Sequence, residues 1–583
     1  MRRSLTLGLG LFLVAGSTAC ERGKAKPVTD HPAAEPAPAA AARAELPPAE
    51  PAPSAAEPAT VYGFVRIANP IGFLNEVRTS ILPPAYAMMV NEGMLRSTLA
   101  GVLSHDVADR LDLSKAAGCV LASPKRYDEP VVCALAYKGG FAQLVNDLGR
   151  DNVRAGGPDF AAVDFDGTEV YLRQMGTHVA VATDPTLIES TRTILTERIV
   201  APKDAAANQS FVMTAFASVI WADAESEITA FTDQIDAATG AGALVGGGSS
   251  GSTQALVRIV KDLDTLTLWF GFGEHGPELG YRGFAKPNTS TGKSYGRAAA
   301  SGPFDPKLFA LMPSDAPFSF ALNLDVEGMA TDPYVAQQID QMRRIDALSG
   351  TTQLATAMTD SLKVWREMIR GPGVGGLVVD KKSASFVWAY ELVAGKDSLA
   401  AIDGMTSGLG TALGPDIGQY VKVRPRSARE RVNGLRVGGM TIEPTKEGRA
   451  MLASMTAPLK DFLGSKPQIG IIFAQRGDTL LSAIALDGEG RHLGRLLKAL
   501  DKPKPLSGPI GATVQRHAAD SGLALVNVKT MLDWVRTVSP VGNIPHIGSG
   551  PDDVLFHLRS TPDGSREYVL SVSQDLVDQL RAL

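Results

Sequence analysis

The stretch GCVLASPKRYDEPVVCALAYKGGFAQLVNDLG (Gly118–Gly149) carries the pattern that decides the fold class. Two short apolar runs flank the polar turn PKRYDEP, and the second run ends at a Gly-Gly pair before an amphipathic segment. Such runs around a turn predict a β-hairpin, and apolar residues at helical spacing predict a helix behind it. A second stretch, GGLVVDKKSASFVWAYELVAGKDSLAAIDGM (Gly375–Met405), has the same order of features.

Cys119 and Cys133 lie in the two predicted strands of the first hairpin, each seven residues from Arg126 at the centre of the turn. An antiparallel hairpin centred on Arg126 places them opposite each other, with Val120 opposite Val132. In a non-hydrogen-bonded pair, the separation of facing residues suits a disulfide. A slip of one residue in register would separate the two cysteines and leave two buried thiols. We predict a structural disulfide.

Two further patterns recur along the chain. A strand followed at once by a helix is predicted at VYGFVRIANPIGFLNEV (Val61–Val77), and the same order returns at Ser210–Phe231, Pro317–Met329 and Gly522–Val535. In three of the four, an Asn lies near the end of the strand, where it can cap the helix or turn the chain (Asn69, Asn323 and Asn527). In Thr168–Leu195 a predicted hairpin ends at Asp184, which suits a helix N-cap, and Pro185 follows at the first helical position. Gln468–Leu500 repeats that order.

Hairpins that alternate with amphipathic helices predict an α+β fold, with antiparallel sheets built from hairpins and the helices packed on one face. The recurrence is one of pattern rather than of identical residues. It predicts an internal duplication, with a first α+β half over residues 61–300 and a second over 305–583.

Composition limits the kind of protein. The 583 residues are 44% hydrophobic and 20% charged, which is typical of globular domains. The net charge is −5, and removal of Arg2 and Arg3 with a signal peptide would make it −7. Because nucleic-acid binding needs clustered Lys and Arg, no nucleic-acid partner is expected.

The first residues, MRRSLTLGLGLFLVAGSTAC, predict export. Arg2 and Arg3 precede a twelve-residue apolar run (Leu5–Gly16), and small residues lead to Cys20. The run is too short to span a bilayer core of about 30 Å, so residues 1–19 are predicted to be a secretory signal peptide. After cleavage, Cys20 is either a free thiol or the lipidated N-terminus of the mature chain.

The sequence STAC (Ser17–Cys20) resembles the lipobox of bacterial lipoprotein precursors, although Ser17 stands where that family prefers Leu. The resemblance covers only the signal peptide and Cys20. It implies that Cys20 is lipidated and anchors an exported protein to a bacterial membrane. The number of cysteines favours the same interpretation, because lipid on Cys20 leaves the other two as a pair. Glu21, in place of the Asp that retains lipoproteins in the inner membrane of enteric bacteria, implies the outer membrane, facing the periplasm or the surface.

Residues 20–60 are predicted to be the lipidated cysteine followed by a disordered linker. From Glu21 to Thr60, 23 of 40 residues are Ala or Pro, and large apolar side chains are scarce. Proline blocks regular structure, and too little apolar surface is present to drive collapse. We expect a tether that holds the folded body away from the membrane.

No local motif predicts catalysis or ligand binding. The eight histidines lie at least eleven residues apart, so none forms a local metal-ligand pair, although a metal site built from distant residues stays open. Gly247–Gly251 fits GxSxG, but it lies in a Gly/Ser run without the strand and helix of a nucleophile elbow. Ser290–Lys293 fits SxxK weakly, and Arg476-Gly477-Asp478 fits a hairpin turn as well as an adhesion tripeptide. We therefore predict no catalytic, cofactor-binding or metal-binding residues.

Three functions follow in order of preference. The first is a lipid-anchored protein of the bacterial cell envelope with a non-catalytic binding or assembly role, whose partners are the membrane and a further envelope protein. The second is a periplasmic carrier of lipids or other apolar ligands, because a sheet covered by amphipathic helices can enclose an apolar site. The third is an envelope hydrolase with a dispersed active site, which would require acid–base or Ser/His groups to converge in one cleft.

Overall fold

A computed structural model describes residues 60–583 apart from 101–104, 150–151, 166, 203–208, 241–256, 258, most of 324–352, 381–382, 413–418, 427–430, 433, 451–467, 487–489 and 539–543. The predicted signal peptide, Cys20 and nearly all of the predicted linker therefore lie outside the described residues. The described chain forms two compact units. The first comprises residues up to 225 with 265–281, and the second comprises 226–264 with 282–581.

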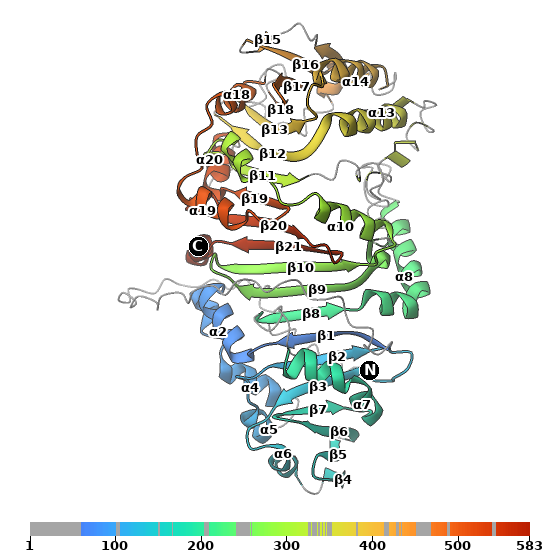
Figure 1. Cartoon of the computed structure of the whole chain (residues 1–583). Coiled ribbons are helices and arrows are strands. Elements are labelled where there is room, and N and C mark those ends of the chain that lie inside the picture. Colours follow the sequence, from blue (N-terminus) through green and yellow to red (C-terminus); the bar gives the residue numbers. More distant parts are fainter. Residues whose placement is uncertain are drawn as a thin grey trace, which may run out of the picture. The chain divides into compact units, whose positions relative to one another are not determined.

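The first unit is built on an antiparallel sheet (Figure 1). Its strands follow the order β4-β5-β6-β7-β3-β2-β1-β8-β9, and β10 pairs with β9. The strands are β1 (Val61–Ile67), β2 (Ala117–Ala122), β3 (Val131–Ala136), β4 (Val153–Gly156), β5 (Phe160–Phe165), β6 (Thr168–Met175), β7 (His178–Ala182), β8 (Phe211–Ala215), β9 (Leu263–Phe272) and β10 (Pro277–Ala285).

The second unit is also built on an antiparallel sheet, in the order β14-β16-β17-β18-β13-β12-β11-β19-β20-β21. A short strand, β15 (Arg431–Val432), pairs with the start of β16. The other strands are β11 (Phe318–Asn323), β12 (Ile369–Val379), β13 (Ala384–Leu392), β14 (Val421–Arg426), β16 (Leu435–Pro444), β17 (Ile469–Arg476), β18 (Thr479–Ala485), β19 (Gly522–Val526), β20 (Val554–Ser560) and β21 (Ser565–Val572).

The two strand orders match position by position, with β1 corresponding to β11, β3 to β13, β7 to β18 and β8 to β19. Two backbone hydrogen bonds recur at corresponding places. Ala68 N–H bonds Ser210 O as Asn323 N–H bonds Ser521 O, and Phe216 N–H bonds Tyr62 O as Asn527 N–H bonds Pro317 O. A repeated order of this kind is what an internal duplication predicts. The predicted boundary near residues 300–305 stays a prediction, since the compact units divide the chain elsewhere.

Both units contain several helices beside their strands. The first unit holds α2 (Pro70–Ser80), α3 (Pro84–Ala87), α4 (Glu92–Ala100), α5 (His105–Arg110), α6 (Phe141–Asp147), α7 (Pro185–Ile194), η3 (Leu195–Val200) and the start of α8 (Ala217–Gly240). The second unit holds α10 (Ser290–Ala300), η5 (Pro306–Leu311), α13 (Gln353–Met368), α14 (Ser398–Ala412), α18 (Leu493–Asp501), α19 (Gly508–Arg516), α20 (Val528–Val538) and α21 (Gln574–Ala582).

The α+β class with antiparallel sheets is confirmed, but the placement of the helices on one face is wrong. In β17, Ile472 and Ala474 pack with α18 and α19 in the main core of the second unit, whereas Phe473 packs with α13 and α14. Because alternate residues of a strand point to opposite faces, these helices lie on opposite sides of the sheet (Figure 1). The amphipathic pattern of a helix shows that one side is buried, without showing which sheet face buries it.

Capping residues fix where several helices begin, as the sequence predicts. The Asn69 side chain accepts a hydrogen bond from Gly72 N–H at the start of α2. Asp184 caps α7 by accepting from Thr186 N–H, with Pro185 as the first helical residue. These bonds satisfy backbone donors that a helix N-terminus leaves free.

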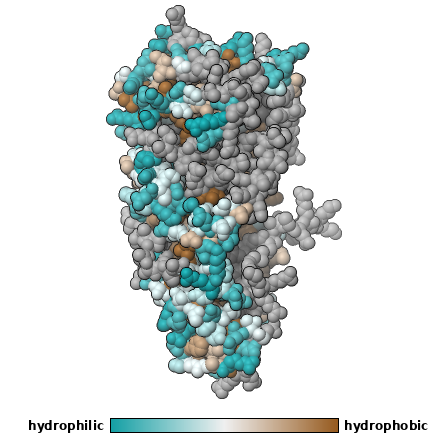
Figure 2. Space-filling view, turned by 90° about the vertical axis from the view of Figure 1, so that its right-hand side faces the viewer, coloured by the Kyte–Doolittle hydropathy of each residue, from teal (hydrophilic) through white to brown (hydrophobic). Residues whose placement is uncertain are grey.

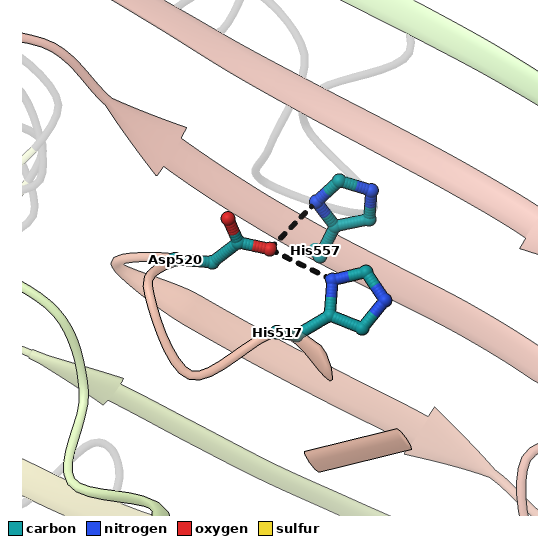
Figure 3. Close-up of side chains that lie close together, drawn as sticks. All are labelled: His517, Asp520 and His557. Carbon is teal, nitrogen blue, oxygen red and sulfur yellow. Dashed lines mark hydrogen bonds and ion pairs between the residues drawn. The ribbon is translucent and has the colours of Figure 1, made fainter. Parts of the chain in front are cut away.

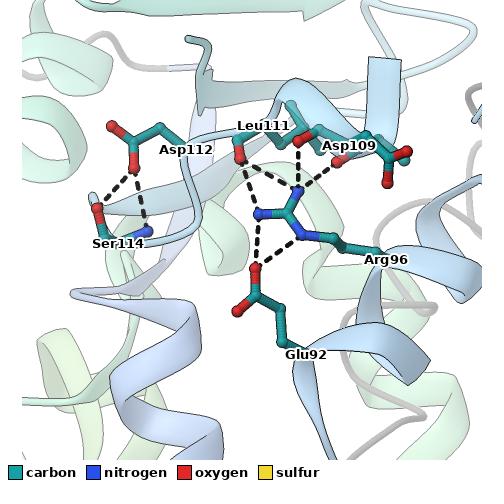
Figure 4. A network of polar contacts seen from close by, with 7 residues as sticks. Glu92, Arg96, Asp109, Leu111, Asp112 and Ser114 are labelled. Atoms are coloured by element: carbon teal, nitrogen blue, oxygen red, sulfur yellow. Dashed lines mark hydrogen bonds and ion pairs between the residues drawn. The ribbon is translucent and has the colours of Figure 1, made fainter. Parts of the chain in front are cut away.

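Arg96 joins α4 to the end of α5 (Figure 4). Its guanidinium donates to the carbonyl oxygens of Ala108 at 2.7 Å and Asp109 at 2.9 Å, and more weakly to that of Leu111 at 3.4 Å. Glu92, one turn earlier in α4, accepts from Arg96 Nε at 2.8 Å and holds the side chain in place. A single, partly buried cation thus satisfies carbonyl groups that the short helix α5 leaves free at its C-terminus.

Candidate functional site

Cys119 and Cys133 form a disulfide across β2 and β3. The register pairs Cys119 with Cys133 and Val120 with Val132, as the position of Arg126 predicts. The Cα atoms lie 3.9 Å apart. The bond joins two interior strands of the sheet and leaves neither thiol free for nucleophilic chemistry, which agrees with a structural role.

Two of the eight histidines meet at one carboxylate in the second unit (Figure 3). His517 follows α19, Asp520 lies in the turn before β19, and His557 lies in β20, which pairs with β19. The Nδ1 atoms of His517 and His557 lie 2.8 and 3.0 Å from the same oxygen of Asp520, Oδ2. All three residues are buried, with 7%, 1% and 4% of their surface exposed. We call these three residues the His–Asp–His cluster.

Arg559 provides a positive charge next to the Asp520 carboxylate. Its Nε and Nη2 atoms lie 3.0 and 2.9 Å from the other oxygen of Asp520, Oδ1. Burial alone would raise the pKa of Asp520, but the hydrogen bond from His517, the adjacent His557 and the Arg559 charge outweigh burial and hold that pKa below its usual value. Asp520 is therefore an ionised acceptor, and His517 donates to it from Nδ1–H.

The Nδ1 atom of His557 is less well hydrogen-bonded than that of His517. Its Nδ1 lies close to Asp520 Oδ2, but not in the direction that a hydrogen bond requires, so this buried nitrogen has no hydrogen-bond partner among the described residues. The two imidazole rings lie side by side, with centroids 4.5 Å apart. Two imidazole nitrogens and one carboxylate oxygen, all within 4.8 Å of one another, make a donor set that suits a metal ion.

The sequence alone could not reveal this cluster. His517 and Asp520 are three residues apart, whereas His557 lies 40 residues later on a strand that only the sheet register brings back. A polar histidine in the apolar strand VLFHLRS (Val554–Ser560) was the one local sign.

A second buried histidine contacts a serine, which bears on the predicted hydrolase. His492 Nε2 lies 2.8 Å from Ser383 Oγ, and Asp380 Oδ2 lies 3.8 Å from the same nitrogen. In a catalytic triad the acid contacts the other imidazole nitrogen, and the serine must be reachable by substrate. Here Ser383 and His492 are each 1% exposed. The contact fixes the turn between β12 and β13 and does not have the arrangement of a nucleophile.

A wide apolar surface lies on one face of the second sheet, and we call it the apolar strip. It consists of two adjacent rows of residues that cross six neighbouring strands, β21, β20, β19, β11, β12 and β13. Within each row, every residue is paired with the next one on the neighbouring strand. The first row is Leu570, Phe556, Ala524, Phe320, Gly375 and Trp388, and the second is Val572, Val554, Val526, Phe318, Leu377 and Phe386. At about 4.8 Å per strand, the strip is about 24 Å long.

The strip lies on the sheet face opposite the main core, because its residues alternate with the core residues Ala321, Leu525 and Leu555. Phe556 and Leu570 are each 39% exposed. The rings of Phe386 and Trp388 contact each other with centroids 4.9 Å apart. Next to this row, burial raises the pKa of Tyr390 to about 12, which indicates a poorly hydrated environment.

The same sheet face carries α13 and α14 beside the strip, because Phe473 lies in register with Trp388 through Ser482. A sheet face that meets water normally carries polar residues, whereas neither row of the strip contains a charged side chain. Phe556 and Leu570 are its exposed members, and its other residues are partly or fully buried. On the face drawn in Figure 2, the coloured hydrophobic residues form small separate patches among hydrophilic ones. An extended apolar surface therefore distinguishes the strip from an ordinary protein surface.

A polar groove of about 450 Å³ lies beside the first turn of α20. Asn527, Lys529, Asp533, Asp315 and Ser549 are among its lining residues. Asp533 pairs with Arg536, and Asn527 caps α20 by accepting from Thr530 N–H at 2.9 Å. Charges of both signs and hydroxyl groups line the groove, and this mixture selects no one class of ligand.

The motifs noted in the sequence are not part of the His–Asp–His cluster or of the apolar strip. Gly247–Gly251, the GxSxG match, lies outside the described residues, as does Cys20. Gly477 of the Arg-Gly-Asp tripeptide forms the turn between β17 and β18 with a φ of 57°, and Arg476 pairs with Asp501. Ser290, the first residue of the SxxK match, bonds Asp262 at the start of α10.

Among the described helices, none has both the length and the apolar character needed to cross a membrane. The described residues thus offer two candidate sites in the second unit, the buried His–Asp–His cluster and the apolar strip. Since comparisons with protein-family models, with curated proteins and with solved structures find no match, the function must be inferred from the residues of this chain.

Proposed function

We propose that this chain is a lipid-anchored protein of a bacterial cell envelope that acts by binding rather than by catalysis, and that its ligand is an acyl lipid held on the apolar strip. The observation that carries the proposal is the continuous pair of apolar rows from β21 to β13, with Phe556 and Leu570 partly exposed at one end.

The chemistry of the strip favours hydrocarbon over a peptide segment. The strands that carry its centre are hydrogen-bonded on both sides, so no free backbone edge is available to pair with an added strand. Apart from the indole N–H of Trp388, no side chain of the two rows can donate or accept a hydrogen bond. An acyl chain is apolar along its length and requires none, and its burial contributes about 0.8 kcal/mol per methylene.

The predicted lipid anchor on Cys20 supports the same proposal. An anchored cysteine followed by about 40 residues of Ala/Pro-rich linker would keep the body near a membrane, which is a source of such ligands. The carrier function ranked second from the sequence thus becomes the preferred one, because the apolar strip gives it a surface.

The test begins with the mature chain, exported with Cys20→Ser so that no covalent lipid is present. We expect native mass spectrometry and solvent extraction to detect acyl lipid bound to the purified protein, and titration with cis-parinaric acid to give saturable fluorescence. Phe556→Gln combined with Leu570→Gln should weaken binding of this probe by about tenfold or more, because the two apolar contacts that are lost together contribute at least about 1.4 kcal/mol.

Leu580→Gln in α21 is the matched control, since Leu580 is 47% exposed and lies outside the sheet. This variant should bind the probe as the parent does. Recovery of a stoichiometric protein partner without lipid would overturn the proposal in favour of assembly. The proposal would also fail if the paired substitution only lowered stability, since that result would mean the strip is packed under another segment of the chain.

A further inference from the structure

We infer that the His–Asp–His cluster is a binding site for a divalent transition-metal ion of the zinc type, held by Nδ1 of His517, Nδ1 of His557 and Oδ2 of Asp520. This inference is independent of the apolar strip and of the proposed lipid ligand.

The donor positions are close to those that a metal requires. Zn–N and Zn–O bonds of about 2.0–2.1 Å in a tetrahedral site separate neighbouring donors by about 3.3 Å. Here the two nitrogens lie 2.8 and 3.0 Å from Asp520 Oδ2. A movement of about half an ångström would therefore open the cluster to a metal, which would displace the Nδ1 proton of His517.

The donor types select the class of metal. Two imidazoles and one carboxylate suit zinc and neighbouring transition metals, whereas calcium and magnesium prefer a shell of oxygens. Three protein ligands leave a fourth position for water or an added ligand. The buried His557 Nδ1, which lacks a well-directed hydrogen bond, is the donor that gains most from such an ion.

Arg559 occupies the outer oxygen of Asp520 and orients the carboxylate, as groups around a metal site commonly do. Its positive charge also opposes the approach of a cation. We therefore expect weaker binding than at a site with the same donors and no adjacent cation.

The first unit shows that the fold does not require this polar cluster. His557 pairs with Leu523, and the corresponding pair in the first unit is Trp269 with Val212. Gln209 precedes Ser210 where Asp520 precedes Ser521. An apolar ring therefore fills the corresponding sheet position in the first unit. Two histidines around a buried carboxylate in the second unit thus point to a role beyond packing.

The experiment uses the untagged mature chain, purified with chelator and dialysed free of it. We expect isothermal titration with Zn²⁺ to show one bound equivalent, and Co²⁺ to give visible absorption typical of four-coordinate nitrogen and oxygen ligation. His557→Gln and His517→Gln should each weaken Zn²⁺ binding by more than about tenfold. His546→Gln, whose side chain is 84% exposed, should bind Zn²⁺ as the parent does.

A melting curve without metal shows whether each variant is folded. If the variants do not fold, X-ray absorption of the Zn²⁺-loaded parent decides, since two imidazole ligands are expected. No Zn²⁺ binding by the folded parent, or unchanged binding after both histidines are replaced, would overturn the inference and leave the cluster as a structural network.

Discussion

Cys119 and Cys133 face each other because the turn between β2 and β3 sets the hairpin register. The disulfide closes a loop whose ends are 14 positions apart. It lies between interior strands, with β1 paired to one side of the hairpin and β7 to the other. The disulfide should therefore contribute to the stability of the first unit as a whole.

We predict that reduction of this disulfide lowers the free energy of unfolding of the first unit by about 3 kcal/mol, the chain-entropy value for a loop of this length. Urea unfolding with and without dithiothreitol measures the change. The variant with Cys119→Ala and Cys133→Ala should start from the lower stability and show no further effect of dithiothreitol. An equal response of parent and variant to the reductant would contradict the prediction.

His178 gives the first unit a dependence on pH. It is 3% exposed in β7, and its Nε2 lies 2.8 Å from Ala116 O. Burial lowers the pKa of His178 below its usual value of about 6.5, despite the opposing backbone hydrogen bond. The folded state therefore holds the imidazole neutral where the unfolded chain would bind a proton.

The contribution of His178 to the free energy of unfolding is consequently complete above about pH 6.5. It is lost as the pH falls below that value. We predict that the free energy of unfolding of the parent decreases from pH 7 to pH 5. The decrease should be smaller in His178→Gln, as measured by urea unfolding at each pH. His546→Gln, at an exposed histidine, should keep the slope of the parent.

At the scale of elements, hairpins and helices follow from local sequence, while the sheet face that each helix covers does not. Gly118–Gly149 forms β2, β3 and α6, and Gly375–Met405 forms β12, β13 and much of α14, as their shared pattern predicts. α18 and α13 are both amphipathic, yet they pack on opposite faces of one sheet. The choice depends on the direction in which each connection leaves its strand.

Arg96 is the residue on which the packing of α4 and α5 depends most clearly. We predict that Arg96→Met lowers the free energy of unfolding by about 2 kcal/mol, because carbonyl groups of Ala108 and Asp109 lose a charged donor. Thermal and urea unfolding measure the effect. Arg192→Met, at an exposed ion pair with Glu189, is the control and should change stability by less than about 0.5 kcal/mol.

At the scale of the whole molecule, two units with the same strand order have different polar interiors. The position of Trp269 in the first unit corresponds to that of His557 in the second. If both units arose from one ancestral half, the two copies have diverged at this position. The proposed metal site therefore belongs to one copy only.

The anchor is the remaining property of the whole chain. We predict that the parent, expressed in a bacterium with its own signal peptide, partitions into the detergent phase of Triton X-114 and incorporates labelled palmitate. Cys20→Ala should abolish both, because the thioether can form only on that sulfur. Labelling of the Cys20→Ala variant would show that the STAC resemblance is misleading.

Part of this protein could be worked out from its sequence. The α+β class, the hairpins, the helix starts at Asn69 and Asp184, and the cysteine register all depend on residues close together in the chain, where spacing and capping chemistry act directly. The expectation that Cys20 carries lipid also depends on adjacent residues, and it stays a prediction.

Only the tertiary structure decided the rest. His557 meets His517 and Asp520 because β20 pairs with β19, and the apolar strip exists because six strands from distant parts of the chain align in one register. Single strands with alternating or continuous apolar residues do not reveal which faces are covered. Sheet register converts scattered side chains into surfaces and sites, and that register is set by contacts between segments far apart in the sequence.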